Sequence, residues 1–381
     1  INDACEQILQ SLGADFNAYT RVFSLSTAQK QMLEIAKAIS RNVKILVMDE
    51  PTAAVSSKEV EKIFSLVREL KARGITIVYI SHRMDEIIEI ADRITVLRDG
   101  ANAGTAEMRN ITRDELVRMM VGYSLDQYYT KSQKTLGDDV LRAEHITRLD
   151  GRVTDASIHL RKGEIVGLAG LVGSGRTELI QTLFGLAKYT GEVTVNGKRA
   201  AFCNPREALA AGVCLVPEDR KHEGLILRND VRFNLSIGVL PQFISIKWLG
   251  VNHVRETKIA NTYVDKLSIK VSSLRQKAVN LSGGNQQKIV LGKWLAASKD
   301  ILILDEPTRG IDVGAKAEIY ALMEELTSQG KSILMVSSEL PEVINMSDRI
   351  YVMQEGRIKA EFDDPVRFDQ EEILSYMLGL K

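Results

Sequence analysis

The chain has 381 residues, which corresponds to two or three domains at about 150 residues per domain. Lysine and arginine together number 50, as do aspartate and glutamate, so the formal net charge is zero and the basic surplus typical of nucleic-acid binders is missing. Hydrophobic residues make up 45 % of the chain and charged residues 26 %, a composition that suits folded domains with large cores and argues against disorder.

The cysteine and apolar patterns exclude further classes of protein. Cys5, Cys203 and Cys214 have neither the number nor the spacing of a disulfide scaffold or a zinc ribbon, which suits a reducing cytoplasm. No apolar run approaches the roughly 18 residues that a membrane-spanning helix needs, and no secretory signal is recognisable. The sequence therefore predicts a soluble cytoplasmic protein, and because it begins at Ile1 rather than Met, we expect its own start to be missing.

The chain contains an internal repeat at a spacing of 256 residues. ILVMDEPT at 45–52 corresponds to ILILDEPT at 301–308, and ADRITVLRDG at 91–100 corresponds to SDRIYVMQEG at 347–356. A period of this length is too long for a solenoid repeat. It therefore indicates that one whole domain has been duplicated.

The repeat also sets the expected domain boundaries. The second copy carries a glycine-rich loop at 170–177, whose counterpart in the first copy would fall upstream of Ile1. We therefore expect 1–122 to be the C-terminal remnant of a first domain that lacks about 120 residues, and 140–381 to be a complete second domain. The polar stretch 123–139 has no apolar periodicity and is expected to be the linker between them.

In the second copy, short apolar runs alternate with helical patterns. The predicted elements, in chain order, are a strand at 164–169, a helix at 177–185, an antiparallel hairpin at 192–199, a helix-rich insertion at 225–280, a strand at 300–305, a helix at 315–330, and strands at 332–338 and 349–354. Because this alternation favours parallel pairing, we predict an α/β fold with a mainly parallel sheet covered by helices on both faces. The hairpin would form an antiparallel edge, and the insertion would form a helical subdomain.

The segment GLVGSGRT lies between a predicted strand and a predicted helix. Apart from Arg176, which stands in place of a lysine, it matches the phosphate-loop pattern, in which glycines let backbone N–H groups surround a polyphosphate. Thr177 would bind Mg²⁺, whereas the forked guanidinium of Arg176 does not simply replace a lysine point charge. A glycine turn before an ordinary helix is the alternative. The predicted nucleotide-binding residues of this loop are Gly170, Leu171, Val172, Gly173, Ser174, Gly175, Arg176 and Thr177.

Two further motifs follow the glycine-rich loop. ILILDEPT is an apolar strand that ends in Asp305, which would hold Mg²⁺, and Glu306, which would orient or deprotonate an attacking water. LSGGNQQK at 281–288 places Ser282 and two glycines immediately before a helix, as in an anion-binding helix terminus. Each pattern alone is also compatible with an ordinary capped helix. The three motifs in this order favour a nucleotide site.

Together these motifs resemble the ATPase domain of the ABC family, a type of P-loop NTPase, over essentially the whole chain. The resemblance implies two domains stacked head to tail, with each ATP between the phosphate loop of one domain and the LSGGQ-like signature of the other. VPEDRKHEGL at 216–225 and DEPTRGIDVGAK at 305–316 resemble the second half of the duplicated ATP-binding subunits of bacterial ribose-, xylose- and galactose-type importers. MDEPTAAVS at 48–56 resembles the first half.

The resemblance implies two unequal nucleotide sites. The residues expected at the better site are Asp49 as a metal ligand, Glu50 as the catalytic glutamate, His82 as the switch histidine, and Ser282, Gly283 and Gly284 of the opposite signature. The residues expected at the poorer site are Arg176, Thr177, Glu218, Asp305, Glu306 and Ser338, opposite Ser26 and Thr27. Here Glu218 replaces the family's glutamine, Ser338 replaces the switch histidine, and the opposite signature is degraded to LSTAQ. We therefore expect the chain as given to hydrolyse ATP poorly.

The resemblance also implies partners. The chain would bind ATP and Mg²⁺ and power import of a monosaccharide through two transmembrane permease subunits, with a periplasmic or extracellular sugar-binding protein as an indirect partner. Its two halves would form a pseudo-dimer, peripheral on the cytoplasmic face of the inner membrane and without nucleic acid. The segment 219–245 would help to form a groove for a permease helix. The alternatives are a tandem ABC protein without a permease, acting as a regulatory or ribosome-associated module, and a nucleotide sensor without turnover.

Overall fold

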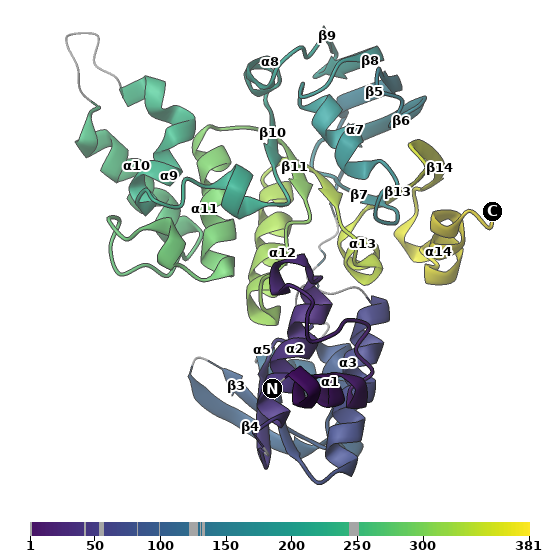
Figure 1. The fold of residues 1–381 in the computed structure, drawn as a ribbon. Helices are drawn as coiled ribbons and strands as arrows, with labels where there is room; N and C mark the ends of the chain where they lie inside the picture. Colours follow the sequence, from purple (N-terminus) through teal and green to yellow (C-terminus); the bar gives the residue numbers. More distant parts are fainter. Residues whose placement is uncertain are drawn as a thin grey trace. The chain divides into compact units, whose positions relative to one another are not determined.

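The computed structural model describes residues 2–41, 43–52, 57–81, 83–98, 100–121, 129, 131, 134–243 and 251–381. They belong to two compact units, Ile1–Ser124 (unit 1) and Leu125–Lys381 (unit 2), shown in Figure 1. Most of the expected linker lies outside the described residues. None of the helices in the described ranges combines the length and the apolar character that crossing a bilayer would require.

Unit 2 is built around a six-stranded sheet with the order β10-β11-β12-β7-β13-β14. Its strands are β7 (Ile165–Ala169), β10 (Val213–Val216), β11 (Ile301–Asp305), β12 (Ser332–Val336), β13 (Arg349–Gln354) and β14 (Arg357–Phe362). All neighbouring strands pair in parallel except β14, which is antiparallel to β13. Because β7 lies inside the sheet, the loop that follows it opens at the carboxyl edge between β12 and β13.

Helix α7 (Arg176–Leu183) is buried between this sheet and a second, antiparallel sheet. The second sheet has the order β6-β5-β8-β9 and consists of β5 (Asp139–Arg148), β6 (Ala156–Arg161), β8 (Tyr189–Val195) and β9 (Lys198–Ala200). Leu179, Ile180 and Leu183 of α7 share one hydrophobic core with strands of both sheets. The β8–β9 pair confirms the predicted antiparallel hairpin, which lies in this second sheet and not at the edge of the main sheet.

The opposite face of the main sheet carries α12 (Val313–Ser328), α13 (Leu340–Met346) and α14 (Gln370–Leu378) (Figure 1). In β7, Gly167 lies between Val166 and Leu168, whose side chains belong to the core that contains α7. Because successive residues of a strand point to opposite faces of the sheet, Gly167 faces α13. A Cβ atom at Gly167 would lie 2.7 Å from Val343 Cγ1 and 2.2 Å from Ser347 Oγ, so glycine permits this close approach. The predicted parallel sheet with helices on both faces is thus confirmed.

The predicted insertion forms a helical subdomain with the start of the signature helix. It contains α9 (Val231–Ser236), the 3₁₀ segment η4 (Ile237–Phe243), α10 (His253–Lys266) and α11 (Gly283–Ala296). The remaining short elements of unit 2 are α8 (Pro205–Ala210), the π-helix η3 (Arg220–Gly224), η5 (Ala278–Asn280) and η6 (Pro365–Arg367). A Cβ at Gly292 would lie 2.6 Å from Leu235 Cδ2, so α9 and α11 pack very closely.

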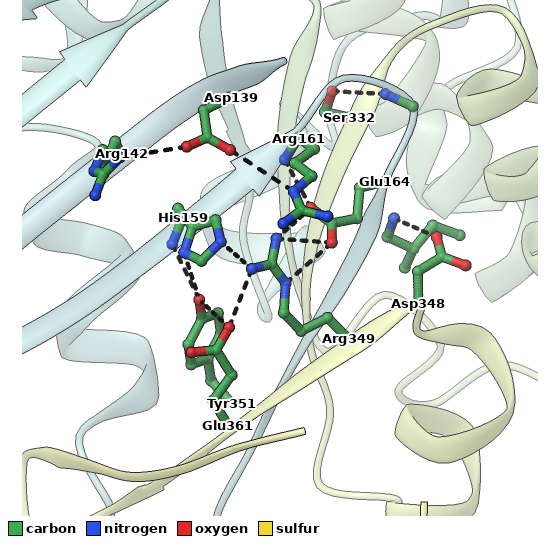
Figure 2. A network of polar contacts seen from close by, with 12 residues as sticks. Asp139, Arg142, His159, Arg161, Glu164, Ser332, Asp348, Arg349, Tyr351 and Glu361 are labelled. Atoms are coloured by element: carbon green, nitrogen blue, oxygen red, sulfur yellow. Dashed lines mark hydrogen bonds and ion pairs between the residues drawn. The ribbon is translucent and has the colours of Figure 1, made fainter. Parts of the chain in front are cut away.

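A buried polar network fixes the start of β7 (Figure 2). Glu164 directly precedes β7, and its carboxylate accepts hydrogen bonds from Arg349 Nε at 3.0 Å and Nη2 at 2.8 Å. Arg349 Nη1 also contacts His159 and donates to Glu361 at 3.1 Å, while the Tyr351 hydroxyl donates to Glu361 at 3.0 Å. Because removing one of two paired buried charges is costly, this network holds β6, β7, β13 and β14 in register.

Unit 1 contains two separate two-stranded sheets. The strands are β1 (Ile45–Asp49) and β2 (Thr76–Ile80), which pair in parallel, and β3 (Arg93–Arg98) and β4 (Ala101–Glu107), which pair antiparallel. Its helices are α1 (Asn2–Ser11), α2 (Thr27–Ile39), α3 (Ser57–Ala72), α4 (Met84–Ile90) and α5 (Arg113–Val121), with the 3₁₀ segments η1 (Val22–Ser24) and η2 (Met108–Asn110). In unit 2 the strand pairs that correspond to β1–β2 and β3–β4 are β11–β12 and β13–β14. There β7 lies between β12 and β13 and joins the two pairs into one sheet.

One face of the β1–β2 sheet is exposed although it is apolar. Leu46 and Met48 are buried in the core that this sheet shares with its helices. The alternate residue Ile45 is 62 % exposed, whereas its repeat partner Ile301, which contacts the α7 core, is 1 % exposed. Val78 and Ile80 continue the exposed face on β2.

Candidate functional site

The glycine-rich loop runs from the end of β7 to the first turn of α7. Gly175 is the N-cap of α7 with φ 100°, a left-handed conformation that favours glycine, and a Cβ there would lie 3.0 Å from Arg152 O. A Cβ at Gly170 would lie 2.5 Å from Met353 O. Between them, Val172 is 92 % exposed at the loop tip. The loop therefore passes close to the sheet at both ends and presents its middle, with the α7 N-terminus, to an anion.

Thr177 and Asp305 lie together beside this loop. The Thr177 hydroxyl donates to Asp305 Oδ2 at 3.2 Å, while Asp305 Oδ1 is buried and has no hydrogen-bond partner among the described residues. Burial raises the pKa of Asp305 to about 6, and the neighbouring charges of Glu306 and Glu223 act in the same direction. A buried carboxylate oxygen without a partner, next to a hydroxyl, fits a hard divalent cation such as Mg²⁺.

Magnesium would need more ligands than these two side chains. In the described parts of the chain, no group of three or more histidine, cysteine, aspartate or glutamate side chains is placed to hold a metal ion. This is the expected situation for Mg²⁺, which binds through one or two protein ligands, substrate phosphates and water.

The Arg176 guanidinium is buried against the carboxylates of the DEPT motif. Its Nη1 donates to Ser337 O at 2.5 Å, and its Nη2 lies 3.7 Å from Glu306 Oε1. Burial lowers the pKa of Arg176, although the charges of Glu306 and Asp305 oppose this shift. The side chain is therefore anchored to the end of β12, where it neutralises part of the acidic pair.

Glu306 is held in a strained backbone conformation after β11. Its φ is 47°, and its amide donates to Val336 O at 2.9 Å. The Ser338 hydroxyl donates to Glu306 Oε2 at 3.1 Å. Within unit 2 the structure therefore brings together Arg176, Thr177, Asp305, Glu306 and Ser338.

Glu218, two residues beyond β10, forms an ion pair with Arg309, which follows the DEPT motif. The sequence reasoning treated Glu218 as a substitute for a glutamine and gave it no partner. Both side chains are substantially exposed, so the pair is accessible to solvent. It connects the segment after β10 with the loop after β11.

The signature residues lie at the N-terminus of α11. Ser282 is the N-cap, and its hydroxyl accepts a hydrogen bond from Asn285 Nδ2 at 2.9 Å. A Cβ at Gly283 would lie 2.7 Å from Arg220 Nη2, and a Cβ at Gly284 would lie 2.6 Å from Ala315 Cβ. Besides their expected place at an anion-binding helix terminus, these glycines are therefore required by internal packing.

In unit 1 the corresponding positions have a related local structure. Ser26 is the N-cap of α2, and its hydroxyl and amide form a capping box with Gln29 at 3.2 and 2.9 Å. Asp49 is exposed at the end of β1, and Glu50 follows it with φ 44°. His82 lies outside the described residues.

Sequence reasoning missed the residues that connect these loops. Arg309 is the partner of Glu218, and Arg220 donates to the carbonyl oxygens of Arg309 and Gly310. The segment 219–245, expected to contribute to a permease groove, contains Arg220 and Leu225, and an expectation that these two residues line a surface is wrong because both are buried. A basic residue inside a polar segment gives no sequence signal that it will pair with main-chain oxygens.

Comparison with known proteins places these features in a family. A family described as ABC transporter matches residues 1–53 and 153–309. The ribose import ATP-binding protein RbsA of Clostridium perfringens (strain 13 / Type A) is 44 % identical over 381 residues, which covers 100 % of the chain and 75 % of the relative. RbsA of Bacillus subtilis (strain 168) is 48 % identical over 337 residues, covering 88 % of the chain and 68 % of the relative.

The xylose import ATP-binding protein XylG of Geobacillus kaustophilus (strain HTA426) is 44 % identical over 380 residues, covering 98 % of the chain and 75 % of the relative. Among solved structures, the ADP conformation of MJ1267, an ATP-binding cassette of an ABC transporter, is similar with a TM-score of 0.52 and 26 % identity, covering 63 % of the chain and 95 % of that structure. The chain therefore belongs to the ABC transporter family, among its ATP-binding subunits.

Proposed function

We propose that the chain is the ATP-hydrolysing subunit that powers import of a monosaccharide through membrane permease subunits. The observation that carries this proposal is similarity along the whole chain to ribose and xylose import ATP-binding proteins. The cluster of charged side chains beside the glycine-rich loop supports it, because it gathers the groups that phosphoryl transfer needs.

In the unit 2 pocket, the loop amides of 170–177 and the N-terminus of α7 would hold the ATP phosphates. Thr177 and Asp305 would hold Mg²⁺, which supplies charge neutralisation for the phosphates when bound. Glu306, held by Ser338, would orient the attacking water. The Arg176 guanidinium would have to move away from Glu306 to contact the ATP phosphates, so we expect slow turnover at this site.

We propose a second, more active site that uses Asp49, Glu50 and His82 with a signature of the type Ser282, Gly283 and Gly284. The support is the family resemblance together with the backbone at Glu50, which matches that of Glu306. The degraded signature LSTAQ, which contains Ser26 and Thr27, would serve the weaker site. This pseudo-dimer of the two ATPase halves makes one hydrolysis event dominant.

We further propose that the chain binds two permease subunits at the cytoplasmic face of the membrane, with a sugar-binding protein as an indirect partner. The segment 219–245 would contribute to the contact. Its exposed residues include the apolar Ile226 and the charged or polar Asp219, Lys221, His222, Glu223 and Arg228, and Phe233 is partly exposed. This mixture of charged and apolar side chains suits a polar-rimmed docking surface.

Site-directed crosslinking tests the proposal. Ile226→Cys, in a background in which the exposed Cys5 and Cys203 are replaced by serine, should crosslink to permease subunits in isolated membranes. Val366→Cys, 93 % exposed on the far C-terminal segment, is the matched control and should not. Crosslinking of both cysteines to ribosomal proteins, or of neither to the permease, would contradict the proposal.

A further inference from the structure

The short π-helix η3 begins two residues after Glu218 and is attached to the signature helix α11 at both ends. Lys293 Nζ on α11 donates to Gly224 O at 2.8 Å, and a Cβ at Gly224 would lie 3.0 Å from Val290 Cγ2. At the other end, Arg220 lies against Gly283. Single π-helical turns often occur at functional sites. Here the turn lies between the nucleotide pocket and the signature.

Arg220 is 9 % exposed and satisfies its charge with main-chain oxygens. Its Nη1 donates to Arg309 O at 2.6 Å and its Nη2 to Gly310 O at 2.8 Å. In the described part of the chain its Nε has no hydrogen-bond partner, and no carboxylate forms an ion pair with it. Burial lowers the pKa of Arg220, while the charge of Asp219 opposes the shift. A guanidinium with this environment is costly to bury, so a purely packing role explains it poorly.

The same two carbonyls connect Arg220 to the catalytic loop. The amide of Arg309 donates to Glu306 O at 3.1 Å, which closes a turn from the catalytic glutamate to the Arg220 contact. On the other side, a Cβ at Gly283 would lie 2.9 Å from Gly310 O. A continuous chain of contacts therefore runs from Glu306 through Arg309 and Arg220 to Gly283.

We propose that Arg220 is a positioning residue that couples nucleotide binding at 170–177 to the conformation of the signature N-terminus at 282–284. This rests on the proposed ATPase function. When nucleotide rearranges the groups around Glu306, the loop carbonyls at 309–310 shift, and Arg220 transmits the shift to α11. The conformation of the signature at 282–284, which acts at the more active site, would therefore depend on whether nucleotide is bound at 170–177.

Hydrogen–deuterium exchange of the full chain, with and without Mg-ATP, tests the coupling. In the wild type, ATP should slow exchange at 170–177, 305–315 and 281–295. Arg220→Lys cannot bond both carbonyls with its single ammonium in the same geometry. We expect it to change the Kd for ATP by less than about twofold, to keep protection at 170–177, and to lose it at 281–295. Arg232→Lys, on the neighbouring α9 with carboxylate partners, should behave as the wild type.

Chemical rescue separates coupling from folding. Arg220→Ala should also lose protection at 281–295, and added methylguanidinium should restore it. Equal protection at 281–295 in the wild type and in Arg220→Lys would overturn the coupling. A wild type in which ATP protects 170–177 but not 281–295 would also overturn it. Absence of protection at 170–177 in the wild type would instead count against the proposed function. In that case the coupling is tested by exchange in the absence of nucleotide. Arg220→Lys must then exchange faster than the wild type at both 281–295 and 305–315.

Discussion

Glu50 and Glu306, 256 residues apart, adopt the same left-handed backbone conformation, with φ of 44° and 47°. The amide of each donates at 2.9 Å to the carbonyl at the end of the adjacent strand, Ile80 and Val336 respectively. A non-glycine residue in this region is strained, and such strain clusters at functional sites. The backbone at this glutamate is thus alike in both copies, so we expect any difference in turnover between the two proposed sites to arise from the other groups around it.

We predict that Asp305→Asn stabilises the nucleotide-free chain and weakens Mg²⁺-dependent nucleotide binding. The folded-state pKa of about 6 lies above the ordinary value of 3.8, so stability falls as the pH rises through this interval and the cost remains at pH 7. The uncharged asparagine removes this cost of the buried carboxylate charge, which should raise the Tm of unit 2 by several degrees. Differential scanning calorimetry measures this shift, and an ATP titration with and without Mg²⁺ measures the binding.

The control for Asp305→Asn is Asp300→Asn at the other end of β11. Asp300 is exposed and pairs with Lys331 at 3.1 Å, so its replacement should change neither quantity by much. If Asp305→Asn left the Mg²⁺ dependence of binding unchanged, the assignment of Asp305 as a metal ligand would be wrong.

Breaking the buried pair at the start of β7 should strongly destabilise unit 2. Arg349→Met leaves the Glu164 carboxylate buried without its partner, which typically costs about 3–5 kcal/mol. The double variant Glu164→Gln with Arg349→Met should lose less than the sum of the two single variants. Urea unfolding measures these values. Arg357→Met, on the exposed side of β14, is the control, and an equally large loss there would argue against the network.

The same network predicts a pH dependence. Burial and the charge of Arg349 lower the pKa of His159 below its ordinary value of 6.5, so the folded chain resists a proton that the unfolded chain accepts. Stability is therefore complete above about pH 6.5 and falls below it. Denaturant unfolding from pH 5 to 8 should show a smaller decline for His159→Gln.

His145 provides a control of opposite sign. Its hydrogen bond to Asp155 raises its pKa, so its contribution is present at low pH and is lost as the pH rises. His145→Gln should therefore leave the loss below pH 6.5 in place or deepen it. An unchanged acid decline in His159→Gln would show that another group is responsible.

The repeat offers a matched pair for the exposed sheet face of unit 1. Ile301→Thr removes a buried apolar group from the α7 core and should cost about 2 kcal/mol, whereas Ile45→Thr should cost less than about 0.5 kcal/mol. Ile45→Thr should also reduce binding of a hydrophobic dye, because Ile45 belongs to a contiguous apolar surface. Similar losses of stability at both positions would contradict the assigned exposure.

The sequence predicted the main sheet well because its strands are short, uniformly apolar runs. The segment 300–305 became β11, and 332–338 became β12, because residues buried on both faces of a parallel sheet must be apolar throughout. The pairing of Thr177 with Asp305 also followed, because strand ends of a parallel sheet meet at one edge.

Other features depend on contacts that residue type does not encode. Arg220 bonds to carbonyl oxygens 89 and 90 residues away, and Glu164 pairs with Arg349 across 185 residues. Neither pair has a local spacing that a motif could reveal. Arg220 lies in the segment 219–245, which is expected to contribute to a surface groove, but it is buried against Gly283, where an added Cβ would lie 2.7 Å from its Nη2.

A titration with a fluorescent ATP analogue in the presence of Mg²⁺ determines whether the loop at 170–177 binds ATP. Gly175→Asp places bulk and negative charge where the phosphates would lie, and Gly212→Asp makes the same change at another left-handed glycine with nothing within 4 Å. We predict saturable binding by the wild type and Gly212→Asp, and a loss of at least about 100-fold in affinity for Gly175→Asp. Equal binding by all three proteins would contradict the account.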